Sequence, residues 1–206
     1  TESLNHLATK GFDVTIINVD KTGIVDPGRI ASAIQPNTKL ISIIFSNNEI
    51  GTINDILSIG QLCKERDILF HVDATQAVGK IKFDVSEMNI DFLSFTAHKL
   101  YGPKGIGALY INNNNPKTKL AKRLFGGSQE GSIKPGTLNV PAIVGFGKAI
   151  EICSQDMAKD FDLTISLRDK FYKNIVSNLN GVSINGSMKD RLPNNLNFFV
   201  DGVRAD

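Results

Sequence analysis

Three segments of this sequence each carry a cluster of polar side chains directly after a short apolar run. The first reads Ser46-Asn-Asn-Glu-Ile-Gly51, the second His71-Val-Asp-Ala-Thr-Gln76, and the third Ser94-Phe-Thr-Ala-His-Lys99. Together they supply amides, a carboxylate, hydroxyls, an imidazole and an amine. Groups of these types hold anionic ligands, move protons or form a covalent bond to a carbonyl carbon. We therefore treat the three segments as candidates for one site.

Two charged residues occupy positions that are unusual for an exposed surface. Asp73 ends a mostly apolar run, where a buried carboxylate needs a cationic partner. That partner can be structural, in a salt bridge or a helix cap, or it can belong to a ligand. Lys99 lies between an apolar run and a loop rich in glycine and proline. Burial there would lower its pKa and leave a nucleophilic amine. Taken singly, neither residue decides between a structural and a functional role.

Short apolar runs alternate with helix-period segments over the first half of the chain. Most of the runs are continuous, which is typical of strands covered on both faces in a mostly parallel sheet. The carboxyl ends of parallel strands share one edge, so this architecture brings the three polar segments together. We expect strands at Val14–Asn18, Leu40–Ser46, Ile68–Asp73, Phe92–Thr96 and Ile106–Ile111.

Helix start and stop signals accompany these strands. Asp26 is expected as an N-cap with Pro27 at the first helical position, and Gly11 suits the end of the first helix. A break in the longest helix is expected near Ser154–Gln155. Two further short strands are expected at Val182–Asn185 and Leu196–Val200. The expected helices are Thr1–Lys10, one from Asp26, Asp55–Arg66 and one from Pro141 to about Asn178.

This order of elements predicts an α/β fold. A mostly parallel sheet sandwiched by helices forms a large domain, and a smaller α+β C-terminal domain begins after it. We place the boundary inside the long helix, with the large domain at residues 1–151 and the incomplete second domain at residues 152–206. Both ends of the chain fall in or beside an expected element. We therefore interpret the chain as a fragment.

The composition narrows the class of protein. The chain has 206 residues, 41% hydrophobic and 21% charged, which is typical of a globular domain. A formal net charge of +2 gives no reason to expect nucleic acid or an anionic membrane as a partner. No apolar run is long enough for a membrane span. Cys63 and Cys153 are far apart and match no metal or disulfide pattern, which favours a reducing, cytoplasmic compartment without a metal site.

The polar segments, taken with their flanking residues, resemble a known family. Their order and spacing are similar to the pyridoxal-phosphate motif of the class V aminotransferase superfamily, and in particular to the NifS/IscS branch of cysteine desulfurases. The resemblance covers essentially the whole chain. The stretches that carry it are Asn47–Gly51, Phe70–Gly79, Asp91–Tyr110, Gly126–Glu130 and Gly136–Pro141.

The resemblance implies a fold-type I enzyme that binds pyridoxal 5′-phosphate and acts as a homodimer. Its activity would convert L-cysteine to L-alanine and pass sulfur, as an enzyme persulfide, to an acceptor or scaffold protein for iron–sulfur cluster or thionucleoside assembly. The resemblance places the persulfide cysteine and the arginine that binds the substrate carboxylate beyond Asp206. The histidine that stacks on the cofactor would precede Thr1. For residues 1–206 alone, it predicts little or no desulfurase turnover.

The resemblance also implies the catalytic pair of groups. Lys99 would be the Schiff-base lysine that holds the cofactor and then moves protons at the substrate. Asp73 would pair with the pyridinium nitrogen. A carboxylate there keeps the ring protonated, and a protonated ring withdraws electrons from the substrate Cα.

The remaining cofactor contacts are implied in the same way. Asn48 and Gln76 would hydrogen-bond the phenolate oxygen of the cofactor ring. Thr96 and His98 would donate to its phosphate. Thr137 would complete the phosphate site of the neighbouring subunit, so that each active site is shared across the dimer.

Other interpretations compete with these. His71 is expected to be a packing residue, Glu49 to support its loop, and both cysteines to lie in apolar helix faces rather than to carry sulfur. The protein could instead be another class V enzyme, such as a selenocysteine lyase or an aminotransferase. A non-catalytic scaffold or dimerisation domain is a further alternative, against which the joint presence of Asp73 and Lys99 argues.

Overall fold

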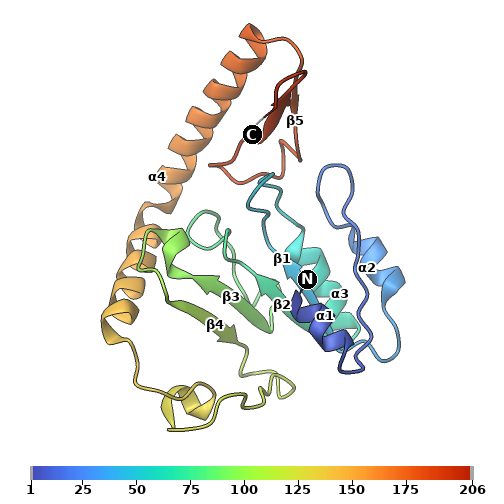
Figure 1. Cartoon of the computed structure of the whole chain (residues 1–206), viewed down its shortest axis with the longest axis vertical. Helices are drawn as coiled ribbons and strands as arrows, with labels where there is room; N and C mark the ends of the chain where they lie inside the picture. The colour runs from blue at the N-terminus through green and yellow to red at the C-terminus, as the bar shows by residue number, and fades with distance from the viewer. Residues whose placement is uncertain (1, 205–206) are drawn as a thin grey trace.

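The computed structural model describes residues 2–204 of the chain (Figure 1). The expectations that concern Thr1 and Asp206 lie outside these residues. A four-stranded sheet has the order β1-β2-β3-β4, in which β1 to β3 are parallel and β4 is antiparallel to β3. This arrangement confirms the mostly parallel α/β sheet. The strands are β1 (Leu40–Ile44), β2 (Leu69–Asp73), β3 (Phe92–Thr96) and β4 (Gly107–Ile111).

The two faces of β2 differ in chemistry. Phe70 and Val72 are fully buried in the main core, where helix α3 (Ile56–Glu65) contributes Ile59. Side chains alternate along a strand, so His71 and Asp73 point to the other face. The sheet thus anchors β2 through one face and leaves polar groups on the other.

The helices begin at the positions that their capping residues predict. Asp26 accepts a hydrogen bond from the Gly28 backbone, and Asp55 accepts one from the Ser58 backbone. Each cap satisfies a backbone N–H that has no partner within the helix. Gly11 has a φ of 86°, which closes the turn after the first helix. The helices are α1 (Glu2–Ala8), α2 (Pro27–Ala33), α3, α4 (Val140–Asn178) and the 3₁₀ turns η1 (Ala97–Leu100) and η2 (Gln129–Ser132).

The strand expected at Val14–Asn18 is wrong. The segment runs without regular structure, and the side chains of Ile16 and Val19 are 61% and 49% exposed. A strand is stabilised by a hydrogen-bonded neighbour. None of the described residues forms a ladder with this segment, so its β-branched composition alone does not produce one.

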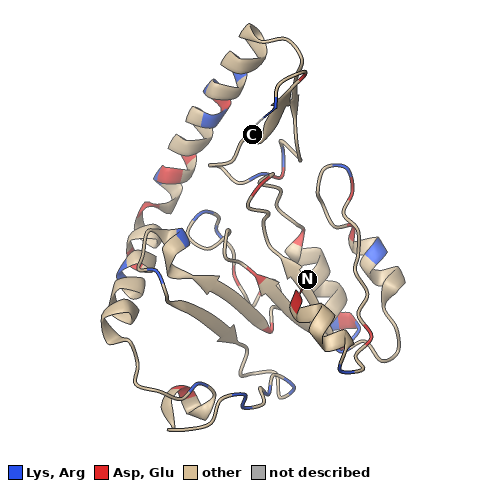
Figure 2. Ribbon diagram, in the orientation of Figure 1, with Lys and Arg blue, Asp and Glu red and all other residues tan. Residues whose placement is uncertain are grey.

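The break expected near Ser154–Gln155 is also wrong, because α4 is a single helix. Kinks arise at proline, at glycine pairs or at inserted groups, and a serine followed by glutamine supplies none of these. Figure 2 shows acidic and basic residues alternating along the upper half of α4, as is typical of a solvated helix. A second, antiparallel sheet of β5 (Val182–Ile184) and β6 (Phe198–Val200) follows. The division at residue 151 stays a prediction, since α4 passes through it.

Candidate active site

The carboxyl edge of the parallel strands carries most of the predicted site residues. Asp73 is the last residue of β2 and pairs in register with Ser94 of β3. Thr96 ends β3 two residues later, and η1 follows at once with His98 and Lys99, both exposed. The sheet register therefore places a carboxylate, a hydroxyl, an imidazole and an amine along one edge. We call this edge the rim.

The Asp73 carboxylate keeps one oxygen available. Its Oδ1 accepts a hydrogen bond from the backbone N–H of Thr75 at 3.0 Å. Among the described residues, Oδ2 has no hydrogen-bond or ion-pair partner. A half-buried carboxylate with a free oxygen suits a cationic N–H from a ligand.

Thr96 and His98 hydrogen-bond to each other at the end of β3. The Thr96 hydroxyl lies 3.1 Å from the carbonyl of Ile106 and 2.9 Å from Nδ1 of His98. The hydroxyl has one hydrogen, which it donates either to the Ile106 carbonyl or to Nδ1 of His98. When Nδ1 accepts it, the neutral imidazole carries its own hydrogen on Nε2. Nε2 of His98 is then the ring atom left to meet a ligand. The phosphate role of Thr96 stays a prediction.

The turn after β2 holds a lysine that sequence reasoning missed. Lys80 Nζ donates to Oε1 of Gln76 at 2.8 Å. Burial lowers the pKa of Lys80, and the nearby charge of Lys99 lowers it further, while Cys153 opposes both. The four-residue spacing from Gln76 within a helix-like turn is the sequence signal that could have found it.

The loop that carries Asn48 is fixed from two directions. Asn47 Oδ1 accepts from the backbone N–H groups of Glu49 and Ile50, which makes a local turn. The carbonyl of Glu49 accepts from Nδ2 of Asn195 at 2.8 Å and from Nδ2 of Asn197 at 3.2 Å. Asn48 itself is exposed. The distant asparagines were missed because no spacing rule connects positions so far apart.

Helix α4 fixes the turn that carries Lys99. Ala97 and Leu100 of η1 pack against Phe146 and Ala149 of α4 in a small cluster of buried residues. The apolar residues on either side of Lys99 are therefore anchored, and its own side chain stays accessible. Packing of this kind sets the direction in which an exposed side chain leaves the backbone.

His71 lies two residues before Asp73 on the same face and bridges three strands. Its Nδ1 is 2.8 Å from the Ser42 hydroxyl, and its Nε2 is 3.2 Å from the Ser94 hydroxyl. Burial lowers the pKa of His71, although the charge of Asp73 opposes this shift. Both ring nitrogens are engaged by serines, which supports the expected packing role.

The two cysteines lie in helices, as expected. Cys63 is 1% exposed, and burial raises the pKa of its thiol to about 12. Cys153 is half-buried on α4, and its Sγ is 3.9 Å from the carbonyl of Leu100. A protonated, buried thiol is a poor nucleophile. Cys63 is therefore a core residue.

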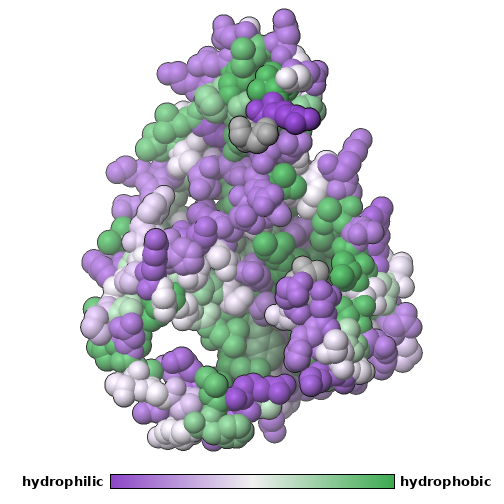
Figure 3. Space-filling view, viewed as in Figure 1, coloured by the Kyte–Doolittle hydropathy of each residue, from purple (hydrophilic) through white to green (hydrophobic). Residues whose placement is uncertain are grey.

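Thr137 is not part of the rim. It is exposed in the segment before α4 and makes no hydrogen bond to another described residue. In Figure 3 an opening separates this lower part of the chain from the sheet and α4. Phe125 in the same segment is 85% exposed. The segment projects from the chain rather than completing its own site.

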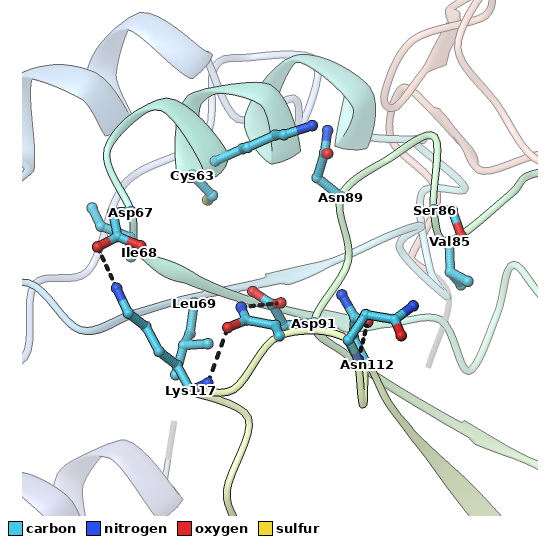
Figure 4. Close-up of a pocket in the computed structure, with 13 residues that line it drawn as sticks. Cys63, Asp67, Ile68, Leu69, Val85, Ser86, Asn89, Asp91, Asn112 and Lys117 are labelled. Atoms are coloured by element: carbon cyan, nitrogen blue, oxygen red, sulfur yellow. Dashed lines mark hydrogen bonds and ion pairs between the residues drawn. The ribbon is translucent and has the colours of Figure 1, made fainter.

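A pocket of about 330 Å³ lies at the opposite edge of the sheet (Figure 4). Its polar groups pair with one another, as Lys117 does with Asp67 and Asn115 does with Asp91. None of the predicted site residues lines this pocket. The pocket is lined by Cys63, Lys64, Asp67, Ile68, Leu69, Val85, Ser86, Asn89, Asp91, Asn112, Asn114, Asn115 and Lys117.

Among residues 2–204, every helix is too short or too polar to cross a bilayer. No three His, Cys, Asp or Glu side chains in that range come together as metal ligands.

Comparison with known proteins decides the family. The sequence model described as aminotransferase class V matches residues 2–206. The chain belongs to this family. A protein of Vibrio campbellii named cysteine desulfurase IscS is 45% identical over 199 residues, which are 95% of this chain and 49% of that protein. A mitosomal cysteine desulfurase of Encephalitozoon cuniculi is 47% identical over 188 residues, which are 91% of this chain and 43% of that protein.

Solved structures agree on the fold of this class V aminotransferase chain. A structure named NifS-like protein matches it with a TM-score of 0.91 and 34% identity, covering 98% of this chain and 55% of that one. The resemblance and the α/β fold class are thereby confirmed. The chain spans about half the length of the curated relatives it matches.

The rim fits the cofactor of class V aminotransferases, pyridoxal phosphate. A protonated ring nitrogen needs a carboxylate, and Asp73 offers a free oxygen. An anionic ring oxygen and a phosphate need donors, which the free amide end of Gln76 and Nε2 of His98 provide. An aldehyde needs an amine, and Lys99 is exposed beside them. The donor set is thus complementary to the cofactor.

Proposed function

We propose that this chain is the cofactor-binding part of a cysteine desulfurase that converts L-cysteine to L-alanine. The sulfur would pass as an enzyme persulfide to an acceptor or scaffold protein for iron–sulfur cluster or thionucleoside assembly. The observation that carries the proposal is the rim, where a free carboxylate oxygen at Asp73 and an exposed amine at Lys99 share one edge of the sheet. Relatives named cysteine desulfurase, at 45% and 47% identity, support the choice of reaction.

When bound, pyridoxal phosphate supplies an electron sink for the electron pair released at the substrate Cα. Asp73 Oδ2 would accept a hydrogen bond from the ring N–H and keep that nitrogen protonated. Lys99 Nζ would hold the cofactor covalently and would carry the substrate proton. The anchored backbone of η1 keeps this amine at the rim.

Four other side chains would orient the cofactor. Asn48 and Gln76 would donate amide N–H groups to the phenolate oxygen. His98 would donate Nε2–H to the phosphate, with Thr96 fixing the imidazole through Nδ1. Groups held in place before binding stabilise a charged ligand without a further entropy loss.

We further propose a homodimer in which Thr137 reaches the phosphate site of the neighbouring subunit. Phe125 and Leu124 near it are 85% and 59% exposed, and apolar side chains exposed to this degree favour a protein contact. A cytoplasmic location is proposed on the two free thiols, Cys63 and Cys153, because disulfides are rare in reducing compartments.

The test uses the full-length protein and its Lys99→Ala variant, with Lys104→Ala as the matched control. Lys104 is exposed in the loop that follows η1. The wild type and the control should show a visible absorption band with added pyridoxal phosphate, and borohydride should fix the cofactor on Lys99. Lys99→Ala should lose both signals and the formation of alanine from L-cysteine. A cofactor fixed at another lysine would overturn the proposal.

A further inference from the structure

Lys80 is a half-buried lysine without an acidic partner. Within residues 2–204 it forms no salt bridge, and its side chain hydrogen-bonds only to Oε1 of Gln76, at 2.8 Å. Removing an ammonium group from water without a counter-ion is unfavourable, so an unpaired lysine in such a place calls for an explanation. Besides burial, the charge of Lys99 lowers the pKa of Lys80 and Cys153 raises it.

The chemistry of the two side chains defines how the Gln76 amide is turned. An ammonium group has three donors and no acceptor, so it can meet only the carbonyl end of the amide. The NH₂ end of Gln76 then points away from Lys80, and none of the described residues accepts from it. With Lys80 in place, the NH₂ group of Gln76 is the end that is left to meet a ligand, and it is a donor. Without it, the amide could rotate and present its carbonyl oxygen instead.

We propose that Lys80 is a positioning residue that holds Gln76 as a hydrogen-bond donor toward the anionic oxygen of the bound cofactor ring. This inference rests on the proposed function, because it takes pyridoxal phosphate as the ligand. It adds a residue that touches the site only through another side chain. The donor orientation matters because an amide carbonyl facing an anionic oxygen would repel it.

The surroundings of Lys80 support this role. Burial lowers the pKa of Lys80, and the charge of Lys99 lowers it further. The Lys80 ammonium lies beside Gln76 and forms an ion pair with none of the described carboxylates, which makes this part of the rim favourable for an anion. Gly79, the residue before it, lies so close to Leu100 and Cys153 that the turn is held against η1 and α4.

The experiment measures the dissociation constant of pyridoxal phosphate in the full-length protein, by absorbance titration of the apoprotein. Lys80→Met keeps the length of the side chain and removes the donor, and it should weaken binding about tenfold, the size expected for one hydrogen bond to a charged group. Lys82→Met is the matched control, since Lys82 is exposed two residues away. It should bind within about twofold of the wild type. Lys80→Arg retains a donor and should restore most of the affinity.

A double-mutant cycle with Gln76→Ala separates positioning from general structural damage. If Lys80 acts through Gln76, Lys80→Met should have no further effect on affinity, or on the visible circular dichroism of the cofactor, once Gln76 is alanine. Additive effects, or a Lys80→Met variant that binds like the wild type, would overturn the inference. A wild-type protein that takes up no cofactor at Lys99 would instead refute the proposed function, so the two failures are distinguishable.

Discussion

At the scale of the residue, the thiol of Cys63 has a property that a simple reaction can measure. Burial, together with the charge of Asp91, raises the pKa of this thiol to about 12. Only the thiolate reacts, so at pH 8 a fraction of about one in ten thousand is available even before access is considered. We expect Cys63 to resist N-ethylmaleimide in the folded protein, as followed by mass spectrometry, and to react within minutes in urea.

Cys153 provides the internal comparison for this prediction. Its pKa is also raised, by burial first and then by the charges of Asp160 and Asp156, with Lys80 in opposition, but the residue is only half-buried. It should therefore react faster than Cys63 in the folded state. Equal rates for Cys63 in the folded and unfolded protein would show that α3 does not pack on β2 as described.

The residues of the rim differ in how easily they can be recognised from the sequence. A carboxylate or an amine at the end of an apolar run is conspicuous, so Asp73 and Lys99 were candidates for that reason, and the family resemblance supplied their roles. Lys80 was not predicted, because its role depends on a hydrogen bond that forms only after the turn at residues 74–81 has closed. The contact with the Thr96 hydroxyl likewise determines which ring nitrogen of His98 can face a ligand. The amino-acid composition does not reveal this contact.

At the scale of the element, the close contact between the turn after β2 and η1 depends on a glycine. A Cβ on Gly79 would lie 2.5 Å from Cδ2 of Leu100 and 3.2 Å from Sγ of Cys153, at a φ of +76°. Gly79→Ala should destabilise the protein by about 3 kcal/mol, from overpacking added to backbone strain. Urea unfolding measures the change.

Gly105→Ala separates the effect of overpacking from that of backbone strain. Gly105 has a φ of +83°, but a Cβ there would meet nothing within 4 Å. This variant should lose only the backbone contribution, about 1 kcal/mol. If both variants were equally stable, the turn and η1 would not be in the contact that positions Lys99.

Elements were predictable where local signals and tertiary contacts agree. The caps at Asp26 and Asp55 are local, and both helices begin there. The segment at 14–18 has strand composition, yet composition cannot provide a neighbouring strand. The continuity of α4 through Ser154 was missed for the opposite reason, because a polar pair was given more weight than the absence of any helix-breaking residue.

At the scale of the whole molecule, Asn195 connects the C-terminal segment to the loop that carries Asn48. Its Nδ2 donates to the carbonyl of Glu49, and its Oδ1 accepts from Arg191 Nη1 at 2.8 Å. Asn195→Ala should destabilise the protein by about 2 kcal/mol and speed amide hydrogen exchange in residues 47–54. Asn194→Ala, at the exposed neighbouring position, is the control. Unchanged exchange in Asn195→Ala would show that the loop is ordered without this contact.

The contact between the Glu49 loop and the C-terminal segment also affects folding during synthesis on the ribosome. The carbonyl of Glu49 accepts hydrogen bonds from donors that lie 146 and 148 residues later in the chain. The strands that follow the loop can pair while synthesis continues, but the Glu49 carbonyl lacks these two protein donors until residues 195–197 emerge. Translation at about 5–20 residues per second makes that interval roughly 7–30 s. A nascent chain that ends before residue 195 should therefore have a formed sheet and a loosely ordered ligand-binding edge. Chaperones, or a cofactor that binds early, would encounter the chain in that state.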